Sequence, residues 1–249
     1  MISMLFQSNL STEEKLMLGA MIVVVLIYSL SIHELMHGYS AFLLGDDTAK
    51  LKGRLTMNPL AHLDPIGSLM FLFIGFGWAK PIPVDYGKLT RLKSRDAMVR
   101  IVSVAGVTAN FLSAWVAYFL LSMVNLIASN TSWVRGGSES AIFVYSIIIQ
   151  FIWLFFHFNL LLMAFNLLPF PPLDGYHILE TIIPHRYRIR FYKYEPYFRY
   201  GLMALVLLGM FTGFSPLFWL VEKIQLPFRY IIQTPLDWLS PLNKYISIT

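Results

Sequence analysis

The segment Ser-Ile-His-Glu-Leu-Met-His-Gly at residues 31–38 places a His-Glu-x-x-His pattern inside a long apolar run. Between residues 16 and 45, Glu34 is the only side chain expected to be ionised. Because residues four apart lie on one face of a helix, His33 and His37 can offer two imidazole nitrogens to one metal ion. Glu34 lies on the same turn, where it can serve as a general base. The pattern predicts a zinc-dependent hydrolase of the zincin type.

A structural alternative is a helix with two hydrogen-bonded histidines and a glutamate that faces a pore. A carboxylate at the centre of a membrane costs roughly 2.5–3.5 kcal/mol on insertion scales, so ionisable residues there usually serve a function. This cost favours the metal site over the structural alternative.

The composition is that of a membrane protein. The 249 residues are 57% hydrophobic and only 13% charged, and the mean hydropathy is +0.61. The absence of cysteine excludes disulfides and cysteine-ligated zinc, so any metal must be bound by His, Asp or Glu. The net charge is +5, but the basic residues lie between apolar runs, which indicates topology signals and no nucleic-acid partner. Glu13 and Glu14 precede the first apolar run, unlike the basic start of a cleavable signal peptide.

The apolar runs predict an all-α polytopic membrane protein that forms a single domain over residues 1–249. Four runs are long enough to cross a bilayer, and they cover residues 16–44, 97–129, 140–168 and 200–221. Residues 65–79 are apolar but short, so we expect a re-entrant or packed segment. The alternation of apolar and polar residues over 49–55 predicts a small strand near the site.

The loop charges predict the orientation in the cell membrane. Residues 80–100 and 185–199 are rich in Lys and Arg and should be cytoplasmic, with the N-terminus outside. The second half of the first span, the first half of the second and the end of the third then lie in the cytoplasmic leaflet. The polar side chains that can meet there are His33, Glu34, His37, Asn110 and Asp174.

A catalytic zinc site needs a third protein ligand, because zinc in such sites takes three side chains and keeps one position open. No suitable residue follows His37 closely on the same helix. Asp174 is favoured by context, since it follows a proline-rich break at the inner edge of the third span and adds negative charge. The other candidates are His62, His157 and His177.

Several stretches together resemble the site-2 protease family of intramembrane zinc metalloproteases, in its compact prokaryotic branch without PDZ or CBS domains. The matching stretches are residues 33–38, 53–67 (GRLTMNPLAHLDPIG), 77–84 (GWAKPIPV), 105–110 and 166–175. The resemblance implies that His33, His37 and Asp174 ligate one zinc ion and that Glu34 is the general base. It also implies that Asn110 contacts the substrate or the developing oxyanion. Where the family commonly has proline after Gly106, Val107 stands here, which leaves a straighter helix possible.

We therefore expect hydrolysis of a peptide bond in or near a transmembrane helix of a membrane-protein substrate, as in regulated intramembrane proteolysis. The substrate must unwind locally, and residues 49–55 or 80–84 could hold it extended by pairing at a strand edge. The alternative is a metal-ion carrier or a scaffold with a vestigial zinc site. Glu34 separates the two interpretations, because a carrier needs only the ligands whereas a hydrolase also needs the base.

Overall fold

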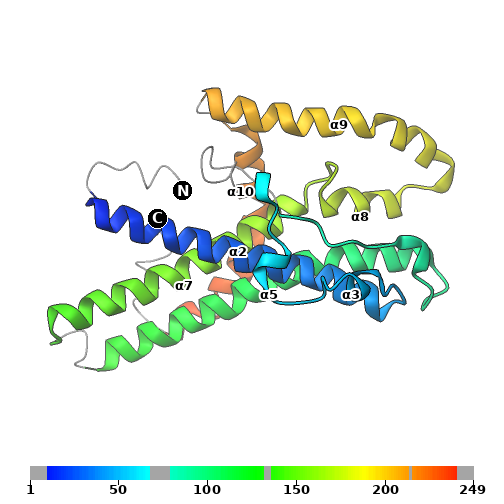
Figure 1. Ribbon diagram of the computed structural model, residues 1–249. Helices are drawn as coiled ribbons and strands as arrows, with labels where there is room; N and C mark the ends of the chain where they lie inside the picture. Colours follow the sequence, from blue (N-terminus) through cyan, green and yellow to red (C-terminus); the bar gives the residue numbers. More distant parts are fainter. Residues whose placement is uncertain (1–9, 68–78, 132–135, 213–214, 240–249) are drawn as a thin grey trace. The chain divides into compact units, whose positions relative to one another are not determined.

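The computed structural model describes residues 10–67, 79–131, 136–212 and 215–239, and within these ranges the regular structure is helical with no strand (Figure 1). This confirms the predicted all-α class. The helices are α2 (Thr12–Leu43), α3 (Thr48–Leu51), α5 (Arg95–Asn130), α7 (Glu139–Asn166), α8 (Asp174–Ile182), α9 (His185–Thr212) and α10 (Pro216–Gln233). Single 3₁₀ turns cover Pro59–Ala61, Tyr86–Lys88 and Asp237–Leu239.

The first three predicted spans correspond to α2, α5 and α7, with ends that differ from the predicted ones by a few residues. These three helices are long and apolar enough to cross a membrane. Even the shortest, α7 with 28 residues, is about 42 Å long at 1.5 Å per residue, which exceeds the hydrocarbon core of a bilayer. The chain is thus a membrane protein.

Both ends of α2 follow local rules. At its start, the Glu14 N–H donates to Ser11 Oγ and the Ser11 N–H donates to Glu14 Oε2, which forms a capping box. At its end, Gly45 has a φ of 112°, and the N–H groups of Gly45 and Asp46 donate to the carbonyls of Phe42 and Ala41. This is a Schellman motif, which requires the left-handed conformation that glycine adopts without strain.

The fourth predicted span, residues 200–221, is not one helix. The basic stretch predicted as a loop opens α9 at His185, α9 ends at Thr212, and α10 begins at Pro216. Pro216 occupies the first position of α10, where proline fits because its missing N–H is not needed there. Neither α9 nor α10 counts among the three candidate spans found in the described part of the chain.

The predicted strand over residues 49–55 is also wrong. These residues form the single turn of α3 and a bend at Gly53, whose φ is 64°. Asp46 accounts for part of the difference, because its Oδ1 accepts the Thr48 N–H at 3.0 Å and forms a turn directly before α3. Most of the predicted re-entrant segment 65–79 lies outside the described residues; at its end, Ala79 forms an isolated bridge with Leu63.

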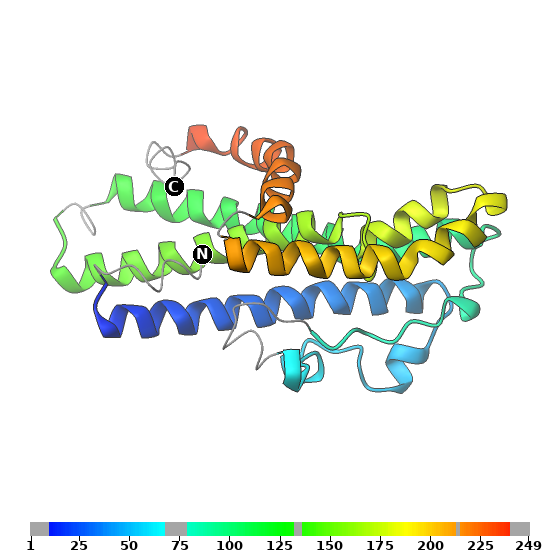
Figure 2. The ribbon, with the colours of Figure 1, turned by 90° about the horizontal axis from the view of Figure 1, so that it is seen from above.

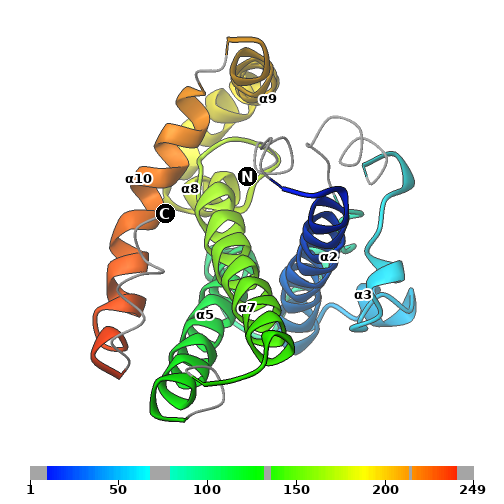
Figure 3. The same ribbon diagram turned by 90° about the vertical axis from the view of Figure 1, so that its left-hand side faces the viewer.

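The chain divides into two compact units, and each is described by itself. The first contains Met1–Ser29, Phe111–Leu160 and Pro227–Thr249. In it, parts of α2, α5 and α7 are joined by polar contacts, visible as neighbouring helices in Figure 3. Asn159 Nδ2 donates to Ser29 Oγ at 2.9 Å, and the Tyr145 hydroxyl donates to Asn125 Oδ1 at 2.8 Å. Such pairs satisfy polar groups within an apolar helix bundle.

The second unit contains Leu30–Asn110 and Leu161–Leu226. Its core joins the end of α2 to the start of α5 through Ala41, Leu44, Leu89, Met98 and Val102. Figure 2 shows α3 and the turn that follows it beside the end of α2. On another side, α8 and the first half of α9 form a helical hairpin, in which the Tyr176 and Phe191 rings stack with centroids 4.8 Å apart. The favoured site residues His33, Glu34, His37, Asn110 and Asp174 all lie in this unit.

Candidate metal centre

Three side chains from two helices converge in the second unit. His33 and His37 lie one turn apart on α2, and Asp174 opens α8. The two Nε2 atoms are 3.0 Å apart. His33 Nε2 lies 3.3 Å from Asp174 Oδ2, and His37 Nε2 lies 3.2 Å from Asp174 Oδ1. Among the residues described, this is the one group of three or more such side chains that could hold a metal ion.

The far nitrogen of each imidazole is bound by α5. His37 Nδ1 lies 2.7 Å from the Val102 carbonyl oxygen, which can only accept, so Nδ1 carries the hydrogen. His33 Nδ1 lies 2.6 Å from Asn110 Oδ1, which accepts in the same way. In the neutral rings, both Nε2 lone pairs therefore face the shared space. This arrangement is typical of metal-binding histidines, whose orientation is set by the hydrogen bond on the other nitrogen.

Gly106 allows α5 to approach the histidines this closely. A Cβ atom on Gly106 would stand 2.4 Å from His37 Nε2 and 2.7 Å from His33 Cε1. Neither distance is possible without displacing the rings. The helix continues through Val107 without a break, in line with the straighter helix that the sequence allows at this position.

Asp174 owes its place to the segment between α7 and α8. Pro169, Pro171 and Pro172 follow the end of α7 and prevent its continuation. Gly175 then packs against the main chain, since a Cβ there would stand 2.3 Å from the Leu167 carbonyl oxygen. Burial raises the pKa of the Asp174 carboxyl, but the imidazoles of His33 and His37 beside it outweigh burial and hold the pKa well below its usual range. Asp174 is therefore ionised at neutral pH, as a metal ligand must be.

The donor set fits a zinc ion. Asp174 Oδ2 is buried and accepts no hydrogen bond from any described residue. Two zinc ligands at tetrahedral angles and bond lengths of about 2.0–2.1 Å stand roughly 3.3 Å apart, close to the 3.0–3.3 Å between the donor atoms here. Two imidazoles and one carboxylate also leave the fourth position open, as catalytic zinc sites do.

Glu34 lies beside this group, and its carboxylate is held by a backbone donor. Oε2 accepts the Ile82 N–H at 2.7 Å. Pro81 and Pro83 carry no N–H, so Ile82 supplies the single donor of this Pro-Ile-Pro run. The Ile82 side chain fills the space over Gly38, where a Cβ would stand 2.3 Å from its Cδ1. Sequence reasoning missed this role of Ile82, although the Pro-Ile-Pro pattern was a usable signal.

The extended segment over residues 80–84 has few free backbone groups. The Lys80 N–H donates to the His62 carbonyl, and Arg54 donates to the carbonyl oxygens of Lys80 and Pro81. With the Ile82 N–H on Glu34, the first half of the segment supports the site. It leaves little main chain there for pairing with an extended substrate.

The other candidate histidines have different surroundings. His62 is buried, and its Nε2 lies 2.8 Å from the Thr56 carbonyl oxygen, so it anchors a loop. His157 belongs to α7 in the first unit and stacks on Trp153 at 5.2 Å between ring centroids. His177 lies one turn after Asp174, with Nδ1 3.4 Å from Glu180 Oε2. None of the three joins the group formed by His33, His37 and Asp174.

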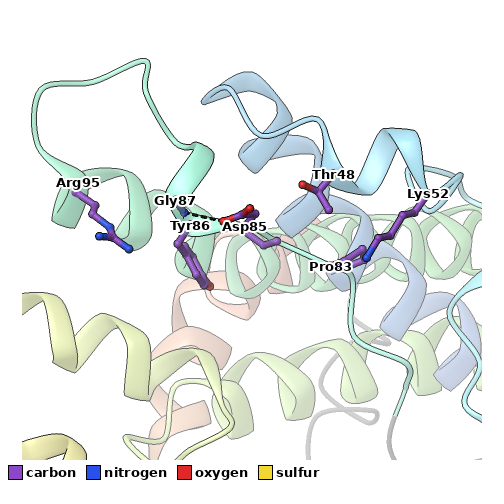
Figure 4. Close-up of a pocket in the computed structure, with 8 residues that line it drawn as sticks. Thr48, Lys52, Pro83, Asp85, Tyr86, Gly87 and Arg95 are labelled. Carbon is purple, nitrogen blue, oxygen red and sulfur yellow. Dashed lines mark hydrogen bonds between the residues drawn. The ribbon is translucent and has the colours of Figure 1, made fainter.

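Two hollows lie on the surface of this unit. One is shallow and lies along residues 83–87, with Thr48, Lys52 and Arg95 at its sides (Figure 4). The other is lined by residues at the start of α5, on α8 and at the start of α9, including His177 and Arg188. Tyr86 lines both, and none of the three converging side chains lines either. The side chains of His33 and His37 are instead buried.

Comparison with known proteins gives consistent matches. A model described as Peptidase family M50 matches residues 21–209. The chain is 42% identical over 176 residues to a protein of Bacillus subtilis (strain 168) provisionally named zinc metalloprotease YwhC, covering 71% of this chain and 75% of that protein. It is 31% identical over 173 residues to Rip2 of Mycolicibacterium smegmatis (strain ATCC 700084 / mc(2)155), which bears the same provisional description, covering 67% and 58%. No solved structure matches the chain.

Proposed function

The chain belongs to peptidase family M50, the site-2 protease family, and from this premise we propose that it cleaves a peptide bond in or near a transmembrane segment of a membrane protein, in regulated intramembrane proteolysis. The family and the names of the relatives support a zinc metalloprotease. The observation that carries the proposal is the position of His33 and His37 within α2, a helix long and apolar enough to cross a membrane. A zinc site on such a helix acts at membrane depth.

In this proposal, His33, His37 and Asp174 hold one zinc ion. When bound, zinc supplies Lewis-acid polarisation of the scissile carbonyl and acidifies water. Glu34 takes a proton from the attacking water on its free Oε1 while Oε2 stays on the Ile82 N–H. Glu34 then gives that proton to the leaving amine nitrogen, so the C–N bond breaks and a carboxylic acid and an amine form; the acid proton passes to the amine, and carboxylate and ammonium are released.

Asn110 acts through His33 in the same proposal. Its Oδ1 lies on His33 Nδ1, which makes it a positioning residue that sets the ring orientation and the tautomer. The sequence resemblance instead implies a contact with the substrate or the oxyanion. The observed hydrogen bond favours the positioning role, because Asn110 Oδ1 already accepts the hydrogen of His33 Nδ1.

The orientation that we propose follows from the charge of the chain. Residues 80–100 and 185–199 are basic and should lie in the cytoplasm. The N-terminus is then extracytoplasmic, and the site lies near the cytoplasmic leaflet of the cell membrane. The partners are the bilayer itself and a substrate with a membrane span.

The test is made on purified protein in detergent, comparing the wild type with Glu34→Gln and with Glu13→Gln, a control on the exposed first turn of α2. Bound zinc is quantified and each protein is incubated with several single-span substrates. We expect all three to bind one equivalent of zinc and only Glu34→Gln to lose cleavage. If all three proteins bind zinc and none cleaves a substrate, a metal carrier or scaffold would be favoured. If the wild type binds no zinc, the assigned metal site is wrong.

A further inference from the structure

The first half of α9 has two distinct faces. The inward face carries Arg188, Phe191 and Glu195. Arg188 donates to both oxygens of Asp96 on α5, at 2.9 and 2.6 Å, and to the Ile183 carbonyl at 3.0 Å. Phe191 stacks on Tyr176 of α8. This face fixes α9 to α5, which binds the far nitrogens of both histidines, and to α8, which begins with Asp174.

The outward face carries a basic stripe, which we define as Arg186, Arg190 and Lys193. Their spacing of four and three residues places them on one side of the helix, and all three side chains are exposed. Within the described ranges none of them forms an ion pair, whereas Arg188 and Arg199 are paired with Asp96 and Glu195. The cationic charge of the stripe is therefore available to a partner.

The surroundings of the stripe indicate what the partner is. Beyond Lys193 the same helix exposes Tyr194, Tyr197 and Tyr200. It then becomes uncharged from residue 201 to its end and exposes Met203 and Leu207. Cations followed by tyrosines and then by aliphatic side chains match the order of headgroup, interface and hydrocarbon in a bilayer. An acidic protein would offer no counterpart to the apolar half.

We propose that the basic stripe binds the phosphate headgroups of anionic phospholipids, with the tyrosines at the interface and the apolar half of α9 against acyl chains. Lipid would contact the exposed face of α9, and the opposite face of α9 packs against α8. Helix α8 begins with Asp174. Anionic lipid thereby restrains the hairpin that carries one of the converging side chains. The binding itself does not depend on proteolysis, so the two proposals fail separately.

The experiment places the full chain in lipid nanodiscs of phosphatidylcholine, with and without phosphatidylglycerol. Retained lipids are counted by native mass spectrometry, and hydrogen exchange is followed in α8 and α9. The test variant is Arg186→Gln/Arg190→Gln/Lys193→Gln. The control Lys52→Gln/Arg91→Gln/Lys93→Gln removes three exposed cations from other parts of the same unit, and Arg186→Lys/Arg190→Lys/Lys193→Arg keeps the charge of the stripe.

We expect the wild type to retain phosphatidylglycerol in preference to phosphatidylcholine and to exchange more slowly in α8 and α9 when it is present. Each cation near an anionic surface contributes about a fivefold preference, so the test variant should lose up to roughly a hundredfold. The control and the charge-preserving variant should behave as the wild type. Equal retention of both lipids by the wild type, or an equal loss in the control, would refute the proposal. Slower exchange caused by soluble polyglutamate in phosphatidylcholine alone would assign the stripe to an acidic protein instead.

Discussion

The main-chain N–H of Ile82 lies 2.7 Å from Glu34 Oε2 and fixes one oxygen of the general base of the proposed mechanism. The contact joins two segments far apart in the sequence, and prolines flank the donor on both sides. The hydrogen bond holds Oε2 in place and so sets the orientation of the carboxylate, while Oε1 can receive a proton. The proposed mechanism requires both roles.

Removing this donor should lower turnover without removing zinc. Ile82→Pro has no N–H, and a hydrogen bond to a charged group contributes about 1.5–3 kcal/mol, so we expect kcat to fall roughly 10- to 100-fold. KM and zinc content should change little. Ile82→Val keeps the N–H and should stay near the wild type. Equal kcat values for the proline and valine variants would show that the hydrogen bond has no role in turnover.

A methyl group on Gly106 should disrupt the metal centre. The new Cβ would overlap both imidazoles. Gly106→Ala should therefore weaken zinc binding by at least about tenfold, as happens when a residue that orients a metal ligand is mutated. Competition with a chromogenic chelator measures the effect. Gly201→Ala makes the same change on α9, where a Cβ meets nothing within 4 Å, and should leave zinc affinity unchanged. A Gly106→Ala protein with wild-type affinity would contradict the geometry.

Asn110 should matter for metal affinity more than for substrate binding. Asn110→Leu removes the acceptor on His33 Nδ1, and loss of such a partner typically weakens metal binding 10- to 100-fold. The measurement is zinc affinity in the absence of substrate. The control Asn159→Leu removes a buried amide of the first unit, which donates to Ser29 Oγ in the same unit. It should leave zinc affinity near the wild-type value. Unchanged zinc affinity with lost cleavage in Asn110→Leu would favour the oxyanion role.

Asp46 should make stability depend on acid pH. Burial raises the pKa of its carboxyl, but hydrogen bonds from the Thr48 hydroxyl and from the N–H groups of Asp85 and Thr48 outweigh burial and hold the pKa below its usual value. A lowered folded-state pKa stabilises the fold above the unfolded value of about 3.9, and this stabilisation is lost as the pH falls through the folded pKa.

Asp46→Asn should therefore lower the Tm at neutral pH, by the equivalent of about 1–3 kcal/mol. The difference from the wild type should shrink as the pH is lowered through the folded-state pKa. Thermal unfolding in detergent at several pH values measures both effects. A constant difference across the acid range would mean that the charge of Asp46 does not contribute.

Local rules in the sequence predicted a large part of this fold. The apolar runs located α2, α5 and α7, because a helix must be about 20 residues long to cross a bilayer. The same rules failed where two signals competed. The run over residues 200–221 is apolar enough for a span, yet Pro216 starts a new helix within it. In residues 49–55, the alternation suggested a strand, but the turn that Asp46 forms with the Thr48 N–H leads into α3 instead.

The sequence by itself determined that His33, Glu34 and His37 share one stretch of helix, because the 3.6-residue period alone brings residues four apart together. Only the tertiary structure decided that Asp174 completes the group, that Val102 and Asn110 orient the imidazoles, and that Ile82 holds Glu34. These contacts join distant segments. They depend on how closely α5 can approach at Gly106 and on where the prolines turn the chain before α8. Periodicity encodes neighbours along a helix, whereas contacts between helices depend on side-chain volume and on the path of the chain.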